Sequence, residues 1–79
     1  MSRAEVFDKL QEIFADVFDD DTIELTDETN SNDIEDWDSL EQINLVVAIE
    51  KEFSIKFAMG EVSKIKNVGE MVDLILERI

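Results

Sequence analysis

The chain has 79 residues, and its 21 acidic and 7 basic side chains give a formal net charge of -14. A chain of this length forms one domain with a small hydrophobic core, and the lack of cysteine excludes disulfides and thiolate metal sites. The negative electrostatic field of such a chain opposes binding to nucleic acid or anionic membranes and favours encounters with basic protein surfaces.

The sequence gives no sign of export or membrane insertion. Residues 1–10 carry Glu5 and Asp8 and lack the long apolar run of a secretory signal. The longest apolar run, Leu45 to Ile49, is far too short to span a bilayer. We therefore expect a single soluble, cytoplasmic domain over residues 1–79, without nucleic-acid or membrane partners.

Residues 2–18 are predicted to form a capped helix that faces the core, running from about Arg3 to Phe18. Ser2 and Glu5 have the spacing of a capping box. Apolar side chains then recur at helical spacing, with phenylalanines on the flank. These residues are Val6, Leu10, Ile13 and Val17, flanked by Phe7, Phe14 and Phe18.

Residues 19–37 form a long polar connection that is rich in Asp, Thr, Asn and Ser. Structureless loops of this length are uncommon in compact domains, so we expect Ile23, Leu25 and Ile34 to hold it against the helices. An EF-hand calcium loop needs a glycine at its sixth position and a glutamate at its twelfth, and no frame of this segment fits. Loose screening of its carboxylates by divalent cations stays open.

Residues 39–53 are predicted to form the central helix. Asp38 has the position of an N-cap, and Glu41 completes a pattern like a capping box. The helix carries more apolar residues than one core-facing stripe requires, so we expect a second apolar face that serves something other than the core. Ser39 lies in the first turn, where unpaired N–H groups and the helix dipole favour a phosphate ester.

The next segment is predicted to return the chain to the bundle. Ile55 and Phe57 are expected to turn inward, and Gly60 to permit a turn. Residues 61–66 can then form one or two helical turns.

Asn67 and Glu70 mark the start of a last helix, which we expect from Val68 to about Arg78. The predicted fold class is therefore all-α. It is a small four-helix bundle of three main helices and one short helix, with a long first loop.

Ser39 lacks a partner for nucleophilic catalysis. Activation of a serine requires a base, and histidine, cysteine and tyrosine are absent from the chain. The nearest lysine in the sequence, Lys51, would lie roughly 18 Å away along a helix axis. We therefore expect no enzymatic activity in the chain itself.

The stretch Asp38-Ser39-Leu40-Glu41, with the apolar pattern that follows it up to Phe53, resembles the acyl carrier protein family. Length, acidity and helix order extend the likeness over nearly the whole chain. The resemblance implies that Ser39, flanked by Asp38 and Leu40, carries 4′-phosphopantetheine, which a phosphopantetheinyl transferase moves from coenzyme A. It also implies acyl cargo held as thioesters on this arm and presented to enzymes of fatty-acid or polyketide-type biosynthesis.

The same resemblance implies two further sets of residues on and near the central helix. Enzymes that load and process acyl groups would bring basic docking patches to Glu41, Ile43, Val47 and Glu50. We expect the carrier to be a monomer. Leu45, Ile49 and Phe53 match inward-facing positions of the family, and with Val62 and Ile65 they would also line a pocket for the acyl chain.

Three positions depart from the fatty-acid type of this family. Asp36 and Trp37 stand where a glycine and a small or aliphatic residue are usual, and Asn44 replaces a common glutamate. Trp37 either plugs the end of the bundle or shapes the docking surface. Two alternatives stay open: a stand-alone carrier of a specialised aminoacyl, peptidyl or lipid-modifying pathway, and an acidic interaction module that is never modified.

Overall fold

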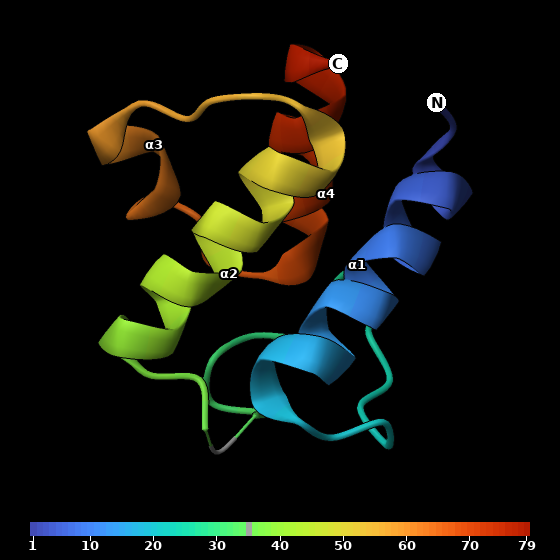
Figure 1. Ribbon diagram of the computed structural model, residues 1–79, viewed down its shortest axis with the longest axis vertical. Helices are drawn as coiled ribbons and strands as arrows, with labels where there is room; N and C mark the ends of the chain where they lie inside the picture. Colours follow the sequence, from blue (N-terminus) through green and yellow to red (C-terminus); the bar gives the residue numbers. More distant parts are fainter. Residues whose placement is uncertain (35) are drawn as a thin grey trace.

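The computed structural model describes residues 1–34 and 36–79. The helices in these residues are α1 (Arg3–Phe18), α2 (Ser39–Phe53), α3 (Met59–Val62) and α4 (Val68–Arg78). Figure 1 shows α1 running opposite to α2 and α4, so that both chain ends lie at the same end of the bundle. The predicted all-α architecture of three main helices and one short helix is confirmed. Within the described residues, none of the helices combines the length and the apolar character that crossing a bilayer requires.

Side-chain caps explain where the first two helices begin. Ser2 Oγ accepts the Glu5 N–H at 3.2 Å, and the Glu5 carboxylate accepts the Ser2 N–H at 3.1 Å, so the predicted capping box forms. At the start of α2, Asp38 Oδ1 accepts the Glu41 N–H at 2.9 Å. The Glu41 carboxylate instead accepts from Asn44 Nδ2 at 3.2 Å, so the box expected at Asp38 is only half formed.

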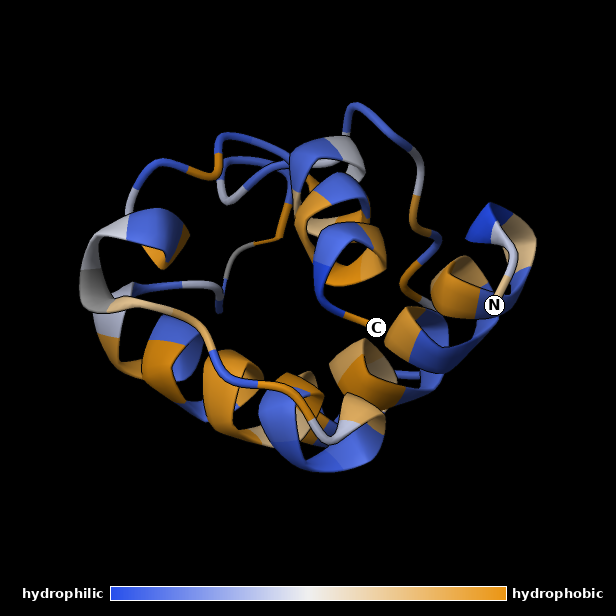
Figure 2. Cartoon of the chain, turned by 90° about the horizontal axis from the view of Figure 1, so that it is seen from above, coloured by the Kyte–Doolittle hydropathy of each residue, from blue (hydrophilic) through white to orange (hydrophobic). Residues whose placement is uncertain are grey.

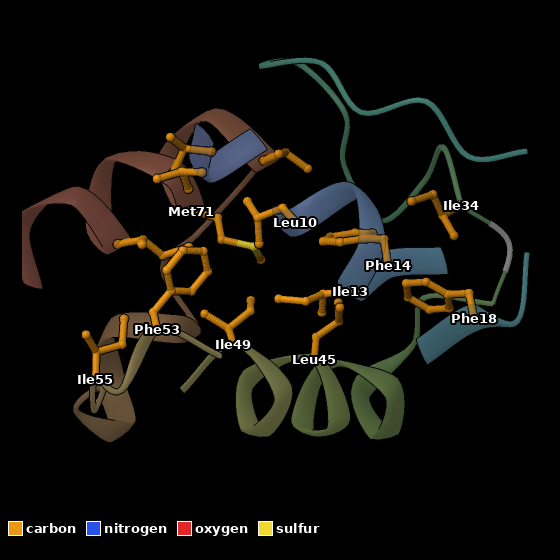
Figure 3. Close-up of a cluster of buried hydrophobic side chains, with 14 residues drawn as sticks. Leu10, Ile13, Phe14, Phe18, Ile34, Leu45, Ile49, Phe53, Ile55 and Met71 are labelled. Carbon is orange, nitrogen blue, oxygen red and sulfur yellow. The ribbon is translucent and has the colours of Figure 1, made fainter. Parts of the chain in front are cut away.

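The hydrophobic core lies between α1, α2 and α4, and Figure 2 shows apolar residues on the inner sides of these helices. In α1 the buried positions include Phe14 and Phe18, whereas Val17 is only half-buried. Trp37 packs against both phenylalanine rings. These two rings, and not the Val17 side chain, therefore fill the interior at this end of α1. The core side chains (Figure 3) are Val6, Leu10, Ile13, Phe14, Phe18, Ile34, Leu45, Ile49, Phe53, Ile55, Val68, Met71, Val72 and Ile75.

The three predicted apolar side chains do hold the long loop between α1 and α2 against the helices. Ile34 is buried, and Ile23 and Leu25 are half-buried against the core. A polar side chain of α1 adds to this attachment, because the Gln11 amide donates to Ile23 O and accepts the Leu25 N–H at 3.0 Å. The sequence pattern did not indicate this role of Gln11.

The same loop caps the start of α4. The Val68 N–H donates to Thr29 O at 2.8 Å, and the Gly69 N–H donates to Asp27 O at 2.9 Å. Thr29 is itself buried, and its Oγ1 accepts the Thr26 N–H at 2.9 Å. The first N–H groups of a helix have no acceptor within it. These two bonds therefore supply acceptors for the first N–H groups of α4 and also fix the loop in place.

The short helix lies earlier in the chain than predicted. It spans Met59–Val62 rather than residues 61–66, and Gly60 lies inside it, without positive φ, instead of forming a turn. The Glu61 carboxylate accepts the Ala58 N–H at 2.7 Å, which satisfies a free donor at the helix start. Beyond α3 the chain continues to Ile65 in tighter turns with hydrogen bonds between residues three apart.

Candidate functional site

Ser39 is the first residue of α2 and is exposed. Its position is fixed by Asp38, the N-cap, whose side chain is bonded to the Glu41 N–H. The remaining N–H groups of the first turn have no acceptor within the helix, and the positive end of the dipole lies here. A phosphate ester on Ser39 would therefore sit in a favourable field.

A groove of about 670 Å³ opens beside Ser39, between α2 and the segment from Phe57 to Lys66. We call it the α2–α3 groove. Its volume lies in the range of roughly 300 to 1,000 Å³ that is common for small-molecule sites. Its apolar lining is Trp37, Ile43, Val46, Phe57, Ala58, Val62 and Ile65, and its polar lining is Ser31, Asp38, Ser39, Gln42, Glu50, Ser63 and Lys66.

The structure divides the predicted acyl-pocket residues between this groove and the core. Val62 and Ile65 line the groove together with Ser39. Leu45 and Ile49 are 0% exposed and Phe53 is 8% exposed, and all three belong to the core (Figure 3). The assignment of an acyl chain to these residues stays a prediction. The residues of α2 that line the groove lie on the neighbouring face of the helix and are Ser39, Gln42, Ile43, Val46 and Glu50.

Trp37 connects the groove to the core at the end where Ser39 lies. Its ring meets Phe14 edge-on, with centroids 5.2 Å apart and an interplanar angle of 84°. Its Nε1–H donates to Gln42 Oε1 at 2.5 Å. Trp37 thus covers the end of the bundle, one of the two roles considered for it, and it also forms part of the groove wall. Gln42, one turn into α2, was not singled out from the sequence.

An apolar stripe runs along the outer surface of α2. Leu40, Ile43 and Val47 are 66%, 61% and 57% exposed, and their spacing places them on one side of the helix. The two carboxylates predicted for partner binding are only half exposed and have partners within the chain. Glu41 accepts from Asn44, and Glu50 Oε2 accepts the Phe57 N–H at 2.8 Å.

Ser39 also lies at the edge of an acidic field. From Leu10 to Glu50 the chain has no lysine or arginine, so basic surfaces are drawn toward this half of the molecule. In the part of the chain that the structure describes, no three acidic side chains gather in an arrangement that could hold a metal ion.

Known proteins match this arrangement closely. The sequence profile of the family described as "Phosphopantetheine attachment site" matches residues 8–75. The chain is 37% identical over 79 residues to the acyl carrier protein of Petrotoga mobilis, with 100% of this chain and 93% of the relative covered. It is 39% identical over 74 residues to the acyl carrier protein of a Picosynechococcus species, with 94% and 91% covered.

Solved structures agree. The holo acyl carrier protein of Geobacter metallireducens superimposes with a TM-score of 0.87 and 52% identity, covering 92% of this chain and 84% of that chain. The acyl carrier protein of Thermotoga maritima gives a TM-score of 0.85 at 27% identity, covering 99% and 91%. The fold and the site therefore define a small helical carrier with a phosphopantetheine attachment site.

The chain belongs to the acyl carrier protein family. Proteins of this family are carriers and not catalysts, and their cofactor is covalently attached 4′-phosphopantetheine. The resemblance, the cofactor and the carrier role expected from the sequence are confirmed. As a carrier, the protein interacts with a phosphopantetheinyl transferase and with acyl-processing enzymes.

The residues at the start of α2 fit this prosthetic group. The Ser39 hydroxyl is accessible to a transferase, and the groove that begins beside it offers apolar lining from Ile43, Val62 and Ile65. When bound, the group supplies a thiol that holds acyl groups as thioesters.

Proposed function

We propose that Ser39 Oγ is the attachment point of 4′-phosphopantetheine and that the α2–α3 groove shelters the acyl chain. The observation that carries the proposal is the exposure of Ser39 at the start of α2, beside a groove that is lined in part by apolar side chains. Asp38 holds the first turn in place so that its free N–H groups face the phosphate. Leu40, exposed next to Ser39, is available to the transferase.

Covalent labelling tests this attachment point. The protein is incubated with coenzyme A and a phosphopantetheinyl transferase of broad specificity, and its intact mass is measured. Wild type is expected to gain the mass of one phosphopantetheine group, and Ser39→Ala to gain none. Ser63→Ala is the matched control, because Ser63 is an exposed serine of the same groove. A mass gain in Ser39→Ala would contradict the proposal, and no gain in any variant would favour the unmodified interaction module.

The partner surface in this proposal is the exposed stripe of Leu40, Ile43 and Val47, bordered by Glu41. Exposed apolar residues that are spaced along one helix face suit a hydrophobic contact with a partner enzyme. The surrounding carboxylates steer basic docking patches toward it. Glu50 lies at the far end of the stripe, but its carboxylate also holds the Phe57 N–H, so it contributes to the groove as well.

Surface substitutions test this docking site. Leu40→Ser and Val47→Ser are expected to reduce the catalytic efficiency of the transferase about five- to tenfold each, as for a central interface contact. Ile79→Ser is the control, because Ile79 is 48% exposed but lies at the chain end. Glu41→Lys should slow association more than Asp21→Lys. If the control variants Ile79→Ser and Asp21→Lys lost as much activity as the variants of α2, this face of α2 would not be a specific docking site. Only the overall charge and hydrophobicity of the surface would then matter.

The pathway belongs to this proposal too. We infer cargo from fatty-acid or polyketide-type biosynthesis, since carriers with this site typically serve such synthesis. Trp37, which replaces a small residue in the groove wall, favours a specialised, lipid-modifying pathway as the second candidate. Acylation assays with straight-chain and modified acyl groups would separate the two.

Monomeric state and cytoplasmic location complete the proposal. A net charge of -14 opposes self-association, and a chain without cysteine suits a reducing compartment. Light scattering coupled to size-exclusion chromatography would test the monomer, and a dimer mass at low protein concentration would exclude it.

A further inference from the structure

The wall of the α2–α3 groove opposite α2 depends on contacts from other parts of the chain. It is built from Phe57 and Ala58, from Val62 of the four-residue helix α3, and from Ser63, Ile65 and Lys66 beyond that helix. A helix of one turn is unstable alone because its nucleation costs more than one turn of hydrogen bonds returns. The position of this wall is therefore set by its tertiary contacts.

Arg78, in the last turn of α4, holds this segment at two points. Its Nη1 donates to Lys56 O at 2.8 Å, and its Nη2 pairs with the Glu61 carboxylate. The two side chains are 34% and 28% exposed, so the pair is less screened than a fully exposed one. One guanidinium thus joins Lys56, the residue before the wall, to Glu61 within α3.

Glu61 carries the contact into the helix itself. Its Oε1 accepts the Ala58 N–H at 2.7 Å, while its Oε2 faces Arg78. The Ala58 N–H, and secondarily the Arg78 guanidinium, hold the pKa of Glu61 below its ordinary value of 4.5. The carboxylate is therefore ionised at neutral pH and available to both partners.

On the other side, the wall is fixed to α2 through Glu50, which accepts the Phe57 N–H at 2.8 Å. The segment from Lys56 to Glu61 is thereby held to α2 at one residue and to α4 at two. If the contacts with α4 are lost, the Glu50 bond and the packing of Phe57 and Ile65 against the core remain, but the position of α3 and Val62 relative to α2 becomes less constrained. Movement of Val62 relative to α2 changes the width of the groove.

We propose that Arg78 and Glu61 are positioning residues that set the width of the α2–α3 groove and, through it, the length of acyl chain that the carrier shelters. The proposal rests on the proposed function, in which the acyl chain attached through Ser39 enters this groove. The guanidinium–carboxylate contact keeps the Val62 wall close enough to α2 to exclude water from a medium-length chain.

The matched control is the other doubly bonded arginine of the chain. Arg3 pairs with Asp27 and Asp73, joining the start of α1 to the long loop and to α4. None of these three residues lines the groove. Arg3→Gln therefore removes a comparable surface contact without touching the wall.

The first measurement needs no loaded protein. Amide hydrogen exchange is followed in wild type, Arg78→Gln, Glu61→Gln and Arg3→Gln. Arg78→Gln is expected to speed exchange two- to fivefold in residues 57–65, the range for the loss of one exposed ion pair, because the glutamine amide can still donate to Lys56 O. Arg3→Gln should leave that segment unchanged. Unchanged exchange there in Arg78→Gln would overturn the proposal, whether or not Ser39 is ever modified.

The second measurement uses protein loaded on Ser39 with acetyl or octanoyl groups, as confirmed by mass. The rate of thioester cleavage by hydroxylamine is compared with that of the free acyl-pantetheine. In Arg78→Gln and Glu61→Gln, the octanoyl thioester should be cleaved two- to fivefold faster than in wild type, while cleavage of the acetyl thioester should change little. Arg3→Gln should match wild type for both. Arg78→Lys should recover part of the loss, since an ammonium can meet only one of the two acceptors at a time.

Each result has a defined meaning. Equal protection of octanoyl in wild type and Arg78→Gln would overturn the role of Arg78. Absence of octanoyl protection in wild type would overturn this proposal and the sheltering role of the groove together, while attachment to Ser39 would stand. Failure to load any chain would instead contradict the attachment site.

Discussion

Gly69 is the glycine of the chain whose replacement should cost the most stability. It is buried in the first turn of α4, and its N–H donates to Asp27 O at 2.9 Å. A Cβ added there would lie 2.9 Å from Asp27 O and 2.9 Å from Asp27 Oδ1, closer than van der Waals contact permits. The side-chain oxygen can move, but the carbonyl cannot move without losing the hydrogen bond from Gly69.

The size of the effect follows from two opposed contributions. Overpacking a tight site costs about 1–3 kcal/mol, and replacing a helical glycine with alanine returns at most about 1 kcal/mol. Gly69→Ala should therefore lower the free energy of unfolding by roughly 1–2 kcal/mol, which corresponds to a fall in Tm of roughly 4–16 °C for a domain of this size. Thermal and urea denaturation, followed by far-UV circular dichroism, would measure it.

Gly60→Ala is the control with the opposite sign. Gly60 is exposed within α3, its φ is not positive, and among the described residues no neighbouring atom lies within 4 Å of an added Cβ. Alanine should therefore stabilise the protein by about 0.5–1 kcal/mol through the lower entropy of the unfolded chain. The steric reasoning is refuted if Gly69→Ala is as stable as wild type or more so.

Three other perturbations follow from caps and charges. Asp38→Ala should lower the free energy of unfolding by about 1 kcal/mol, because the Glu41 N–H loses its acceptor; urea denaturation against Asp36→Ala would reveal it, and equal midpoints would exclude it. The Ala58 N–H and the Arg78 guanidinium lower the pKa of Glu61 from its ordinary value of 4.5, so the stabilisation by the Glu61 carboxylate is present above pH 4.5 and is lost as pH falls through the lower pKa of the folded state. The difference in free energy of unfolding between wild type and Glu61→Gln should therefore shrink in acid, and a difference that does not change with pH would argue against this. Raising salt from ~0.01 M to ~1 M should raise Tm, since it screens repulsion among the carboxylates; a flat Tm would contradict this.

Local chemistry made the main helices predictable. Ser2 and Asp38 accept N–H groups three residues away, and such bonds are encoded in a few consecutive residues. α3 was misplaced for two reasons: the local bond from the Ala58 N–H to Glu61 that begins it was not recognised, and Glu61 is also held by Arg78, 17 residues further along the chain. A short helix with little stability of its own follows such distant contacts as well as its local pattern.

The site was predictable at Ser39 and less so in the groove. The motif placed Ser39 at the start of α2, where the structure has it. The apolar excess of α2 indicated two faces, but periodicity does not say which face meets the core. Leu45 and Ile49 face the core, as the family resemblance implied, whereas Ile43 and Val46 line the groove. The polar neighbours Gln42 and Lys66 gave no signal because they form no pattern with Ser39.

The Gln11 amide gives the long loop an unusual kind of order. It donates to Ile23 O and accepts the Leu25 N–H, so one side chain supplies the donor and the acceptor that a peptide unit of a neighbouring strand would supply. The backbone of the loop at Ile23 and Leu25 is thus held by one side chain in the way that a strand is held by the backbone of its neighbour. The Leu25 amide should therefore exchange with solvent more slowly in wild type than in Gln11→Ala, because the side chain of α1 must release its N–H before exchange can occur.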